Sequence, residues 1–199
     1  MDNFEGQINI VHPKKISSVG FITLIVEILI LTLTSLIFNF FFVKVTVKGA
    51  SMYPTLTDGQ ILTVSKFKEI NYGDIIVIDG ELVENGNSQW IIKRVIGLPG
   101  DTIEIRDGYV FRKSKGEYVF QKIEESYLSE ESLGKTFNSN GEEMRTYQVL
   151  DNEIFYLGDN RSRSEDSRST FSNCNFNQVV GVINSDYDWL RPLDVLFLG

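Results

Sequence analysis

Residues 90–113 read WIIKRVIGLPGDTIEIRDGYVFRK, and this stretch decides the fold class. It contains three short runs rich in isoleucine and valine, separated by the turn residues Pro99-Gly100-Asp101 and Asp107-Gly108. Branched apolar side chains that alternate with polar ones are typical of β-strands, and a Gly after Pro or Asp is typical of the turns between strands. Because connections this short leave no room for a crossover helix, we expect neighbouring strands to pair in the antiparallel sense.

The same pattern of period two extends toward the N-terminus. Strand-like runs lie at residues 44–48, 61–66 and 74–79, with turn residues between them. The alternating pattern does not continue beyond residue 113. Residues 126–146 are polar and poorly patterned, so we expect this segment to form an excursion from the sheet. The sequence therefore predicts a mostly β domain built from antiparallel β-sheet.

An apolar stretch precedes this domain. Residues 19–43, VGFITLIVEILILTLTSLIFNFFFV, carry one charge, Glu27, whose role the sequence leaves open. As an α-helix they would be about 37 Å long, enough to cross the roughly 30 Å hydrocarbon core of a bilayer. A cleaved secretory signal has a shorter apolar region that ends in small residues, whereas this stretch ends in Phe and Val. We therefore expect a short N-terminal segment (1–18), a retained transmembrane helix (19–43) and a β-rich domain (44–199).

The composition excludes several classes of function. The 199 residues include 19 Lys and Arg, 27 Asp and Glu, one His and one Cys, for a net charge of −8. A protein that binds nucleic acid relies on clustered Lys and Arg, so we expect no nucleic-acid partner. The single Cys174 cannot form an internal disulfide. The single imidazole, His12, lies across the apolar stretch from the β-rich domain, so within one chain it cannot act as a base there or complete a zinc site.

Two side chains of the β-rich domain have the chemistry of a nucleophile and a base. Ser51 lies in GASMYPTL (49–56), where small residues precede the hydroxyl and Pro54 restricts the backbone after it. Lys93 lies within IIKRVIGLPGD (91–101), where burial in an apolar strand would favour the neutral amine and lower its pKa. A neutral amine is a usable general base. An ordinary loop serine and a lysine that extends to solvent at a strand edge are the alternatives.

A third segment, YLGDNRSRSEDSR (156–168), completes an ordered set of three motifs behind the apolar stretch. In this order the motifs resemble those of the bacterial type I signal peptidases, membrane-anchored serine proteases that remove signal peptides from exported preproteins. The resemblance covers roughly residues 19–168. It implies the antiparallel β-sheet catalytic domain of that family, with Ser51 as the nucleophile of a Ser-Lys dyad and Lys93 as its general base.

The resemblance also implies supporting roles. Ser164 matches a residue that helps to orient the catalytic lysine, while Asp166 and Arg168 match a supporting salt bridge. The backbone N–H of Ser51 would be one oxyanion donor. Some members of the family provide a second donor as a hydroxyl two residues before the nucleophile, but Gly49 occupies that position here, so the identity of the second donor stays open.

By the same resemblance, shallow apolar pockets accept the small side chains of the substrate. The residues that would line these pockets, or else pack in the core, are Val47, Met52, Leu56, Ile91 and Ile92. The expected partners are the signal peptides of preproteins and the lipid bilayer, with no metal and no other cofactor. The resemblance implies a single-pass protein of the bacterial cell membrane, with its N-terminal segment in the cytoplasm and its catalytic domain on the extracytoplasmic side. Ser51 lies eight residues beyond Val43, which keeps it within about 28 Å of the end of the span.

Other classes of function compete with this interpretation. A catalytically silent relative that acts as a membrane-anchored assembly partner would keep the fold and lose Ser51 or Lys93, and both are present. An acyl transferase of the penicillin-binding type needs Ser-x-x-Lys on a helix. Two pairs have that spacing, but Ser65 and Lys68 lie in a strand-like run, and Ser132 and Lys135 lie in the polar excursion. A surface-anchored binding module is the third alternative, and the oligomeric state stays open.

Overall fold

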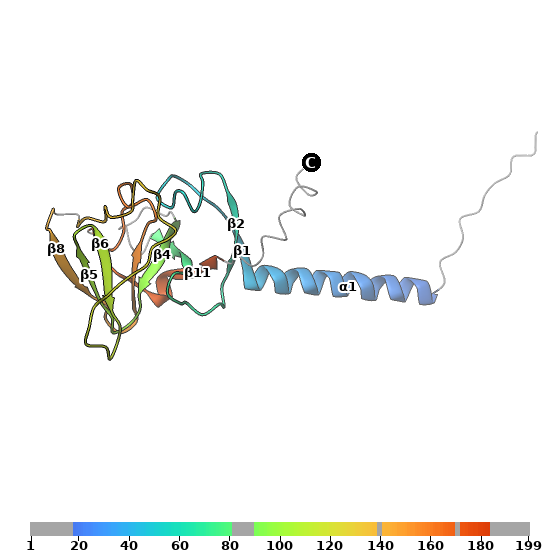
Figure 1. The fold of residues 1–199 in the computed structure, drawn as a ribbon. Helices are drawn as coiled ribbons and strands as arrows, with labels where there is room; N and C mark the ends of the chain where they lie inside the picture. Colours follow the sequence, from blue (N-terminus) through green and yellow to red (C-terminus); the bar gives the residue numbers. More distant parts are fainter. Residues whose placement is uncertain (1–17, 81–89, 139–140, 170–171, 184–199) are drawn as a thin grey trace, which may run out of the picture. The chain divides into compact units, whose positions relative to one another are not determined.

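The computed structural model of the chain describes residues 18–80, 90–138, 141–169 and 172–183. The chain divides into two compact units at the boundary between Phe40 and Phe41. The first unit is built on helix α1, and the second contains two antiparallel sheets (Figure 1).

Helix α1 (Ser18–Phe41) is 24 residues long, and none of its side chains is buried within the protein. Leu, Ile and Val dominate it, and threonine hydroxyls donate to carbonyl oxygens of the preceding turn, as Thr32 does to Leu29 at 2.9 Å. A span in lipid requires that its polar groups find partners within the helix. By length and composition, α1 fits a single-pass membrane anchor.

The helix ends two residues before the predicted boundary at Val43. Phe42 and Val43 instead begin strand β1, where they pair with Ser65 and Val64 of the neighbouring strand. Hydropathy cannot locate this boundary, because an apolar residue scores the same in a membrane helix and in a buried strand. The β-rich unit therefore starts earlier than residue 44.

The larger sheet contains seven strands in the described part of the chain, each antiparallel to its neighbours. Its order is β1-β2-β11-β3-β4-β9-β10. The strands are β1 (Phe42–Thr46), β2 (Ile61–Ser65), β3 (Ile75–Asp79), β4 (Trp90–Gly97), β9 (Glu153–Leu157), β10 (Cys174–Asn175) and β11 (Val179–Ile183), with the 3-10 helix η2 (Phe176–Gln178) between the last two. Strand β4 pairs with β3 along its first half and with β9 along its second.

The smaller sheet has the order β7-β6-β5-β8. Its strands are β5 (Thr102–Arg106), β6 (Tyr109–Lys113), β7 (Gln121–Lys122) and β8 (Met144–Gln148). β5 and β6 form the hairpin that the sequence predicts at Asp107 and Gly108, and these turn residues have positive φ values of 52° and 80°. A two-residue type I′ turn requires this conformation, which an Asp-Gly pair favours.

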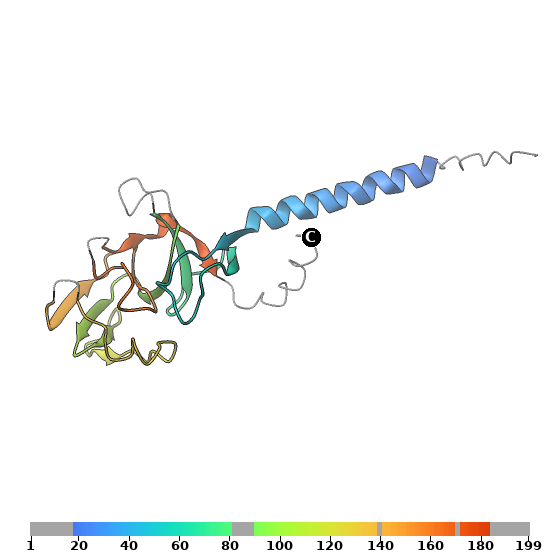
Figure 2. The same cartoon turned by 90° about the horizontal axis from the view of Figure 1, so that it is seen from above.

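Three apolar clusters hold the second unit together. Two of them occupy opposite faces of the larger sheet, because successive side chains of β3 and β4 alternate between them. The third joins the two sheets, because its side chains come from β4 and β9 of the larger sheet and from β5 and β6 of the smaller one. Figure 1 and Figure 2 show the β-rich unit from two directions. The most buried members of this third cluster are Ile103, Ile105, Val110, Phe155 and Leu157.

The strand-like runs of the sequence all form strands, with ends displaced by at most two residues. The predicted excursion over residues 126–146 is wrong at its end, because β8 starts at Met144 and pairs along its full length with β5. Most β8 side chains are exposed, so this strand lacks the alternation of buried and exposed residues that marks a strand in sequence. Its place in the sheet comes from pairing with β5 rather than from local preference.

Replacing Ile103 with Ala tests the cluster that joins the sheets. Ile103 is fully buried, so the truncation removes apolar contacts and leaves a cavity. We expect the free energy of unfolding to fall by about 2–5 kcal/mol, measured by chemical denaturation of the full chain in detergent micelles. Leu150→Ala is the matched control, because Leu150 is 61% exposed. A loss of similar size in both variants would contradict this description of the core.

Candidate active site

The hydroxyl of Ser51 and the amine of Lys93 lie within hydrogen-bonding distance, although 42 residues separate them along the chain. Lys93 Nζ donates to Ser51 Oγ at 3.1 Å and to the carbonyl oxygen of Ile92 at 3.1 Å. Lys93 is buried, with 5% of the residue exposed, whereas Ser51 is partly exposed. A potential nucleophile that solvent can approach therefore lies beside a shielded amine.

Strand β4 directs consecutive side chains to different partners. Lys93 contacts Ser51, while the next residue, Arg94, contacts Asp159. The alternation of a strand predicts that one of these two cations faces the more buried side, yet both are buried, and only 9% of Arg94 is exposed. Arg94 tolerates burial because its guanidinium forms an ion pair with a buried carboxylate.

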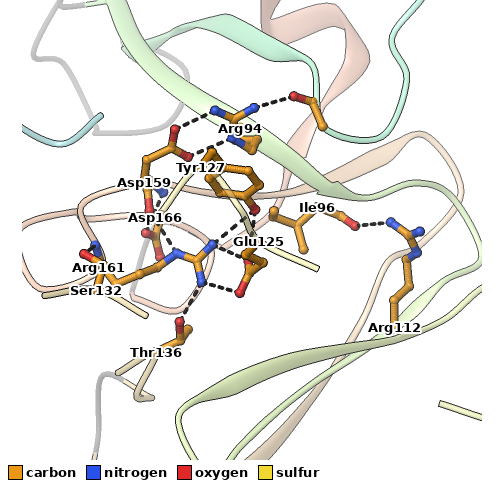
Figure 3. Close-up of polar contacts among 12 residues, drawn as sticks. Arg94, Ile96, Arg112, Glu125, Tyr127, Ser132, Thr136, Asp159, Arg161 and Asp166 are labelled. Atoms are coloured by element: carbon orange, nitrogen blue, oxygen red, sulfur yellow. Dashed lines mark hydrogen bonds and ion pairs between the residues drawn. The ribbon is translucent and has the colours of Figure 1, made fainter. Parts of the chain in front are cut away.

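The Arg94–Asp159 ion pair joins the three motifs of the sequence. Arg94 Nε and Nη2 donate to the two carboxylate oxygens of Asp159 at 2.8 and 2.6 Å (Figure 3). Thr55 Oγ1, from the first motif, donates to the same carboxylate at 2.5 Å. Arg94 Nη1 also donates to the carbonyl oxygen of Gly73 at 2.8 Å. One buried carboxylate thus connects the Ser51 segment, strand β4 and the loop after β9.

The loop after β9 also holds the backbone of Ser51. The N–H of Asn160 donates to the Ser51 carbonyl oxygen at 2.9 Å, and Asn160 Nδ2 donates to the Ala50 carbonyl oxygen at 3.1 Å. Gly158 leaves no room for a side chain, since a Cβ there would overlap the Ser164 hydroxyl and lie 2.6 Å from the Ser51 carbonyl oxygen. Glycine at this position therefore allows Ser51 and Ser164 to approach the same point of the loop.

Asp166 and Arg168 fix the shape of this loop. They form an ion pair in which Arg168 Nε lies 2.7 Å from Asp166 Oδ1, and both residues are buried. Asp166 Oδ2 accepts a hydrogen bond from the N–H of Gly158 at 3.1 Å. Arg168 Nη2 donates to the carbonyl oxygens of Arg161 and Ser164 at 2.9 and 3.5 Å. Charge-assisted hydrogen bonds therefore hold both ends of the loop that carries Ser164.

Gly49 lies in the turn before Ser51 and has a positive φ of 81°. Its N–H donates to Asp58 Oδ1 at 2.7 Å, which fixes this backbone conformation. A residue with a Cβ is strained at such a φ, so a hydroxyl-bearing side chain fits this turn poorly. Gly49 has no side chain that could donate to an oxyanion, and the backbone conformation at this position disfavours any residue that would have one.

A groove of about 390 Å³ opens beside Ser51 and Lys93. The residues that line it are 44–48, Ser51, Met52 and 90–93. Four of the predicted pocket residues, Val47, Met52, Ile91 and Ile92, belong to this lining. Leu56 is not part of the lining; it is 6% exposed and packs in an apolar cluster of the larger sheet, to which Val47, Met52 and Ile92 also belong.

The groove lies between two strand edges. β1 and β4 are four places apart in the sheet order, which would separate them by about 19 Å in a flat sheet. Because both strands line one groove, the sheet must curve strongly. β1 is the last strand on its side, and among the described residues β9 pairs with β4 only from Arg94 onward. The edge of residues 90–92 opposite β3 therefore has no neighbouring strand in the described part of the chain.

Two residues near the site, Glu125 and Tyr127, are not among the predicted site residues. They lie in the polar stretch after β7, where they contact Arg161 and Arg94. A polar stretch without periodicity gives no indication of which carboxylate is buried, so sequence patterns could not single them out.

Comparison with known proteins identifies the chain as a member of a serine protease family that cleaves signal peptides. A model of the family described as signal peptidase, peptidase S26, matches residues 19–189, and the chain belongs to this family. The match continues past Arg168, where the recognised motifs end.

Individual relatives agree with the family match. The chain is 34% identical to signal peptidase I S of Bacillus subtilis (strain 168), over 77% of this chain and 81% of that protein. It is also 34% identical to signal peptidase I of Streptococcus pneumoniae serotype 4, over 71% of this chain and 80% of that protein. A crystal structure of a signal peptidase I from Enterococcus faecalis V583 matches with 31% identity and a TM-score of 0.46, covering 59% of this chain and 98% of that one.

Asp159→Asn measures what the carboxylate that joins the motifs contributes to stability. Arg94 would stay buried opposite a neutral amide, so we expect the free energy of unfolding to fall by about 3–5 kcal/mol. Asp107→Asn is the control, since Asp107 is exposed and its left-handed turn conformation also suits Asn. Chemical denaturation compares the two variants, and equal stability would show that the ion pair is not needed to hold the motifs together.

Proposed function

We propose that the protein is a signal peptidase I that cleaves preproteins with a Ser-Lys dyad, Ser51 as nucleophile and Lys93 as general base. The observation that carries this proposal is the buried Lys93 amine 3.1 Å from Ser51 Oγ. Its position beside a groove between strand edges adds a place for a peptide. Membership of the signal peptidase family makes the signal peptides of exported preproteins the substrate class.

The reaction begins with proton transfer from Ser51 to Lys93. Burial disfavours the charged ammonium, so the Lys93 amine is available in its neutral form to accept the hydroxyl proton. Ser51 Oγ then attacks the scissile carbonyl carbon. The resulting ammonium of Lys93 returns the proton to the leaving amine, and an ester between Ser51 and the signal peptide remains.

The same lysine serves the second half of the reaction. Lys93 accepts a proton from a water molecule, whose oxygen attacks the ester carbonyl carbon. The bond from that carbon to Ser51 Oγ then breaks, the Lys93 ammonium returns its proton to Ser51 Oγ, and the signal peptide leaves as a carboxylate. The backbone N–H of Ser51 makes no hydrogen bond within the described residues, so it is open to the developing oxyanion. Asp166 and Arg168 support this geometry through the loop that carries Ser164, and Ser164 would help to orient Lys93.

An extended substrate fits the groove by strand addition. A peptide backbone can pair with the open edges of β1 and β4, while alternate side chains enter the apolar lining of Val47, Met52 and Ile92. Shallow pockets favour small side chains, as the Ala-x-Ala cleavage site of a secretory signal provides. The part of the signal peptide beyond the groove remains apolar and suits a bilayer.

The membrane arrangement follows from the substrate. A signal peptide is cleaved after its apolar region enters the membrane, so an enzyme anchored by α1 meets it there. We place the short N-terminal segment in the cytoplasm and the β-rich domain on the extracytoplasmic side, with Ser51 tethered close to the outer interface. Protease protection of inverted and right-side-out vesicles would determine this orientation.

Loss of either member of the dyad should abolish cleavage. Ser51→Ala removes the nucleophile and Lys93→Met removes the base while keeping the stem of the side chain. We expect each to lower the rate of precursor cleavage at least about a thousandfold, measured with full-length enzyme and a signal-bearing precursor in micelles. Ser126→Ala and Lys135→Met alter exposed residues and serve as controls. Full activity in either dyad variant would exclude the mechanism, and an inert wild-type protein would favour a silent assembly partner.

The pH dependence tests the neutral amine separately. Activity requires unprotonated Lys93, so kcat/KM should rise with pH through the pKa of this residue. Burial should place that pKa below the value of about 10.4 for a free lysine, because desolvation disfavours the ammonium. A pH–rate profile between neutral and alkaline pH measures the midpoint. A midpoint at or above that of free lysine would show that the amine is not shielded when it acts.

A further inference from the structure

The polar stretch after β7 leads from the smaller sheet to strand β4, which carries Lys93, and to the loop after β9. Glu125 and Tyr127 lie in this stretch, between the guanidinium groups of Arg161 and Arg94 (Figure 3). Glu125 is 7% exposed, although most carboxylates of the surrounding sequence are on the surface. A buried carboxylate needs a cation and hydrogen bonds to offset its desolvation.

Arg161 provides the cation and two of the hydrogen bonds that offset the desolvation of the Glu125 carboxylate. The guanidinium binds the carboxylate in a bidentate manner, with Nη1 3.1 Å from Oε2 and Nη2 in close contact with Oε1. Tyr127 donates its hydroxyl to Glu125 Oε1 at 2.9 Å. Arg161 Nη1 also donates to Thr136 Oγ1 at 2.6 Å, so the ion pair is enclosed by hydrogen bonds.

Arg161, held by Glu125, also contacts the glycine that lies against the Ser51 turn. Its Nε donates to the carbonyl oxygen of Gly158 at 3.1 Å. Gly158 is the residue that has no room for a Cβ against the Ser51 carbonyl oxygen and the Ser164 hydroxyl. The route from Glu125 through Arg161 and Gly158 to Ser51 therefore consists of direct contacts.

Tyr127 makes a second connection, to the base. The guanidinium of Arg94 lies 3.9 Å from the centre of the Tyr127 ring, a distance typical of a cation–π contact. Arg94 follows Lys93 in β4, so its placement influences the direction of the Lys93 side chain. Burial, and then the neighbouring Glu125 carboxylate, raise the pKa of Tyr127, so the phenol stays protonated and continues to donate to Glu125.

We propose that Glu125, together with Tyr127, is a positioning residue for the cleavage reaction: it sets the Ser51 turn through Arg161 and Gly158, and the Lys93 strand through Arg94. The proposal rests on the function proposed above. Without the Glu125 carboxylate, the Arg161 guanidinium would move to another hydrogen-bond acceptor, and its hydrogen bond to the Gly158 carbonyl oxygen would be lost. Ser51 and Lys93 would then lose alignment, which lowers the rate of the chemical step more than substrate binding.

The test compares the rate per active site in the full-length enzyme. Glu125→Gln keeps the shape and removes the charge, and Glu125→Asp keeps the charge on a shorter side chain. A phosphonylating probe that labels Ser51, quantified by mass spectrometry, gives the concentration of competent sites. For Glu125→Gln we expect kcat per labelled site to fall about tenfold or more, with KM nearly unchanged and with labelling of Ser51 slowed by a similar factor. Glu125→Asp should recover part of this loss.

Two further variants keep the outcome decisive. Glu124→Gln alters the adjacent, exposed carboxylate and should match wild type. Tyr127→Phe removes one hydroxyl while leaving the ring against Arg94, so it should fold even if Glu125→Gln does not, and kcat per labelled site should fall about threefold or more.

The positioning role would be overturned if kcat per labelled site were unchanged in Tyr127→Phe and in the folded Glu125 variants. If only the number of labelled sites fell, Glu125 and Tyr127 would have a role in folding alone. Failure of the proposed function gives a different result, because Ser51→Ala would then cleave as well as wild type, whatever the Glu125 variants do.

Discussion

The site depends on a carboxylate buried together with the cation that neutralises it. Asp159 is fully buried, and the bidentate Arg94 guanidinium and the Thr55 hydroxyl offset its desolvation. These three residues come from segments far apart in the chain. Neither charged segment can move away without leaving a buried charge unpaired, and the Thr55 segment cannot leave without removing a hydrogen bond from the buried carboxylate. A requirement of folding therefore also fixes where Ser51 and Lys93 lie.

Alternation along β4 links this ion pair to the chemistry. Arg94 and Lys93 are neighbours, so holding the guanidinium of one restricts the backbone that directs the amine of the other. The two side chains differ in the partners described for them. Arg94 forms an ion pair with a carboxylate, which favours a permanent cation, and Lys93 donates to the Ser51 hydroxyl, the contact that the proposed reaction requires.

Sequence patterns identified the parts of the molecule with strong periodicity. Alternating Ile and Val residues located β2 to β6, and the Asp-Gly pair located the β5–β6 turn. The ordered motifs indicated the family, but only the fold shows that Ser51 and Lys93 are adjacent. Exposed β8 and the position of β11 depend on pairing between distant segments. Glu125 looks like any surface carboxylate in sequence, because its burial is decided by Arg161 from another part of the chain.

In the described part of the chain one edge of β1 has no neighbouring strand, which has a consequence for the solution behaviour of the domain. An unpaired strand edge invites a second copy of the same protein to add a strand, which is a common route to aggregation. Lys44 within β1 and Lys48 two residues after its end are exposed, and lysines at an edge strand disfavour such self-association through charge repulsion and desolvation. The positive charges thus protect this edge against edge-to-edge pairing of two copies without closing the groove beside it.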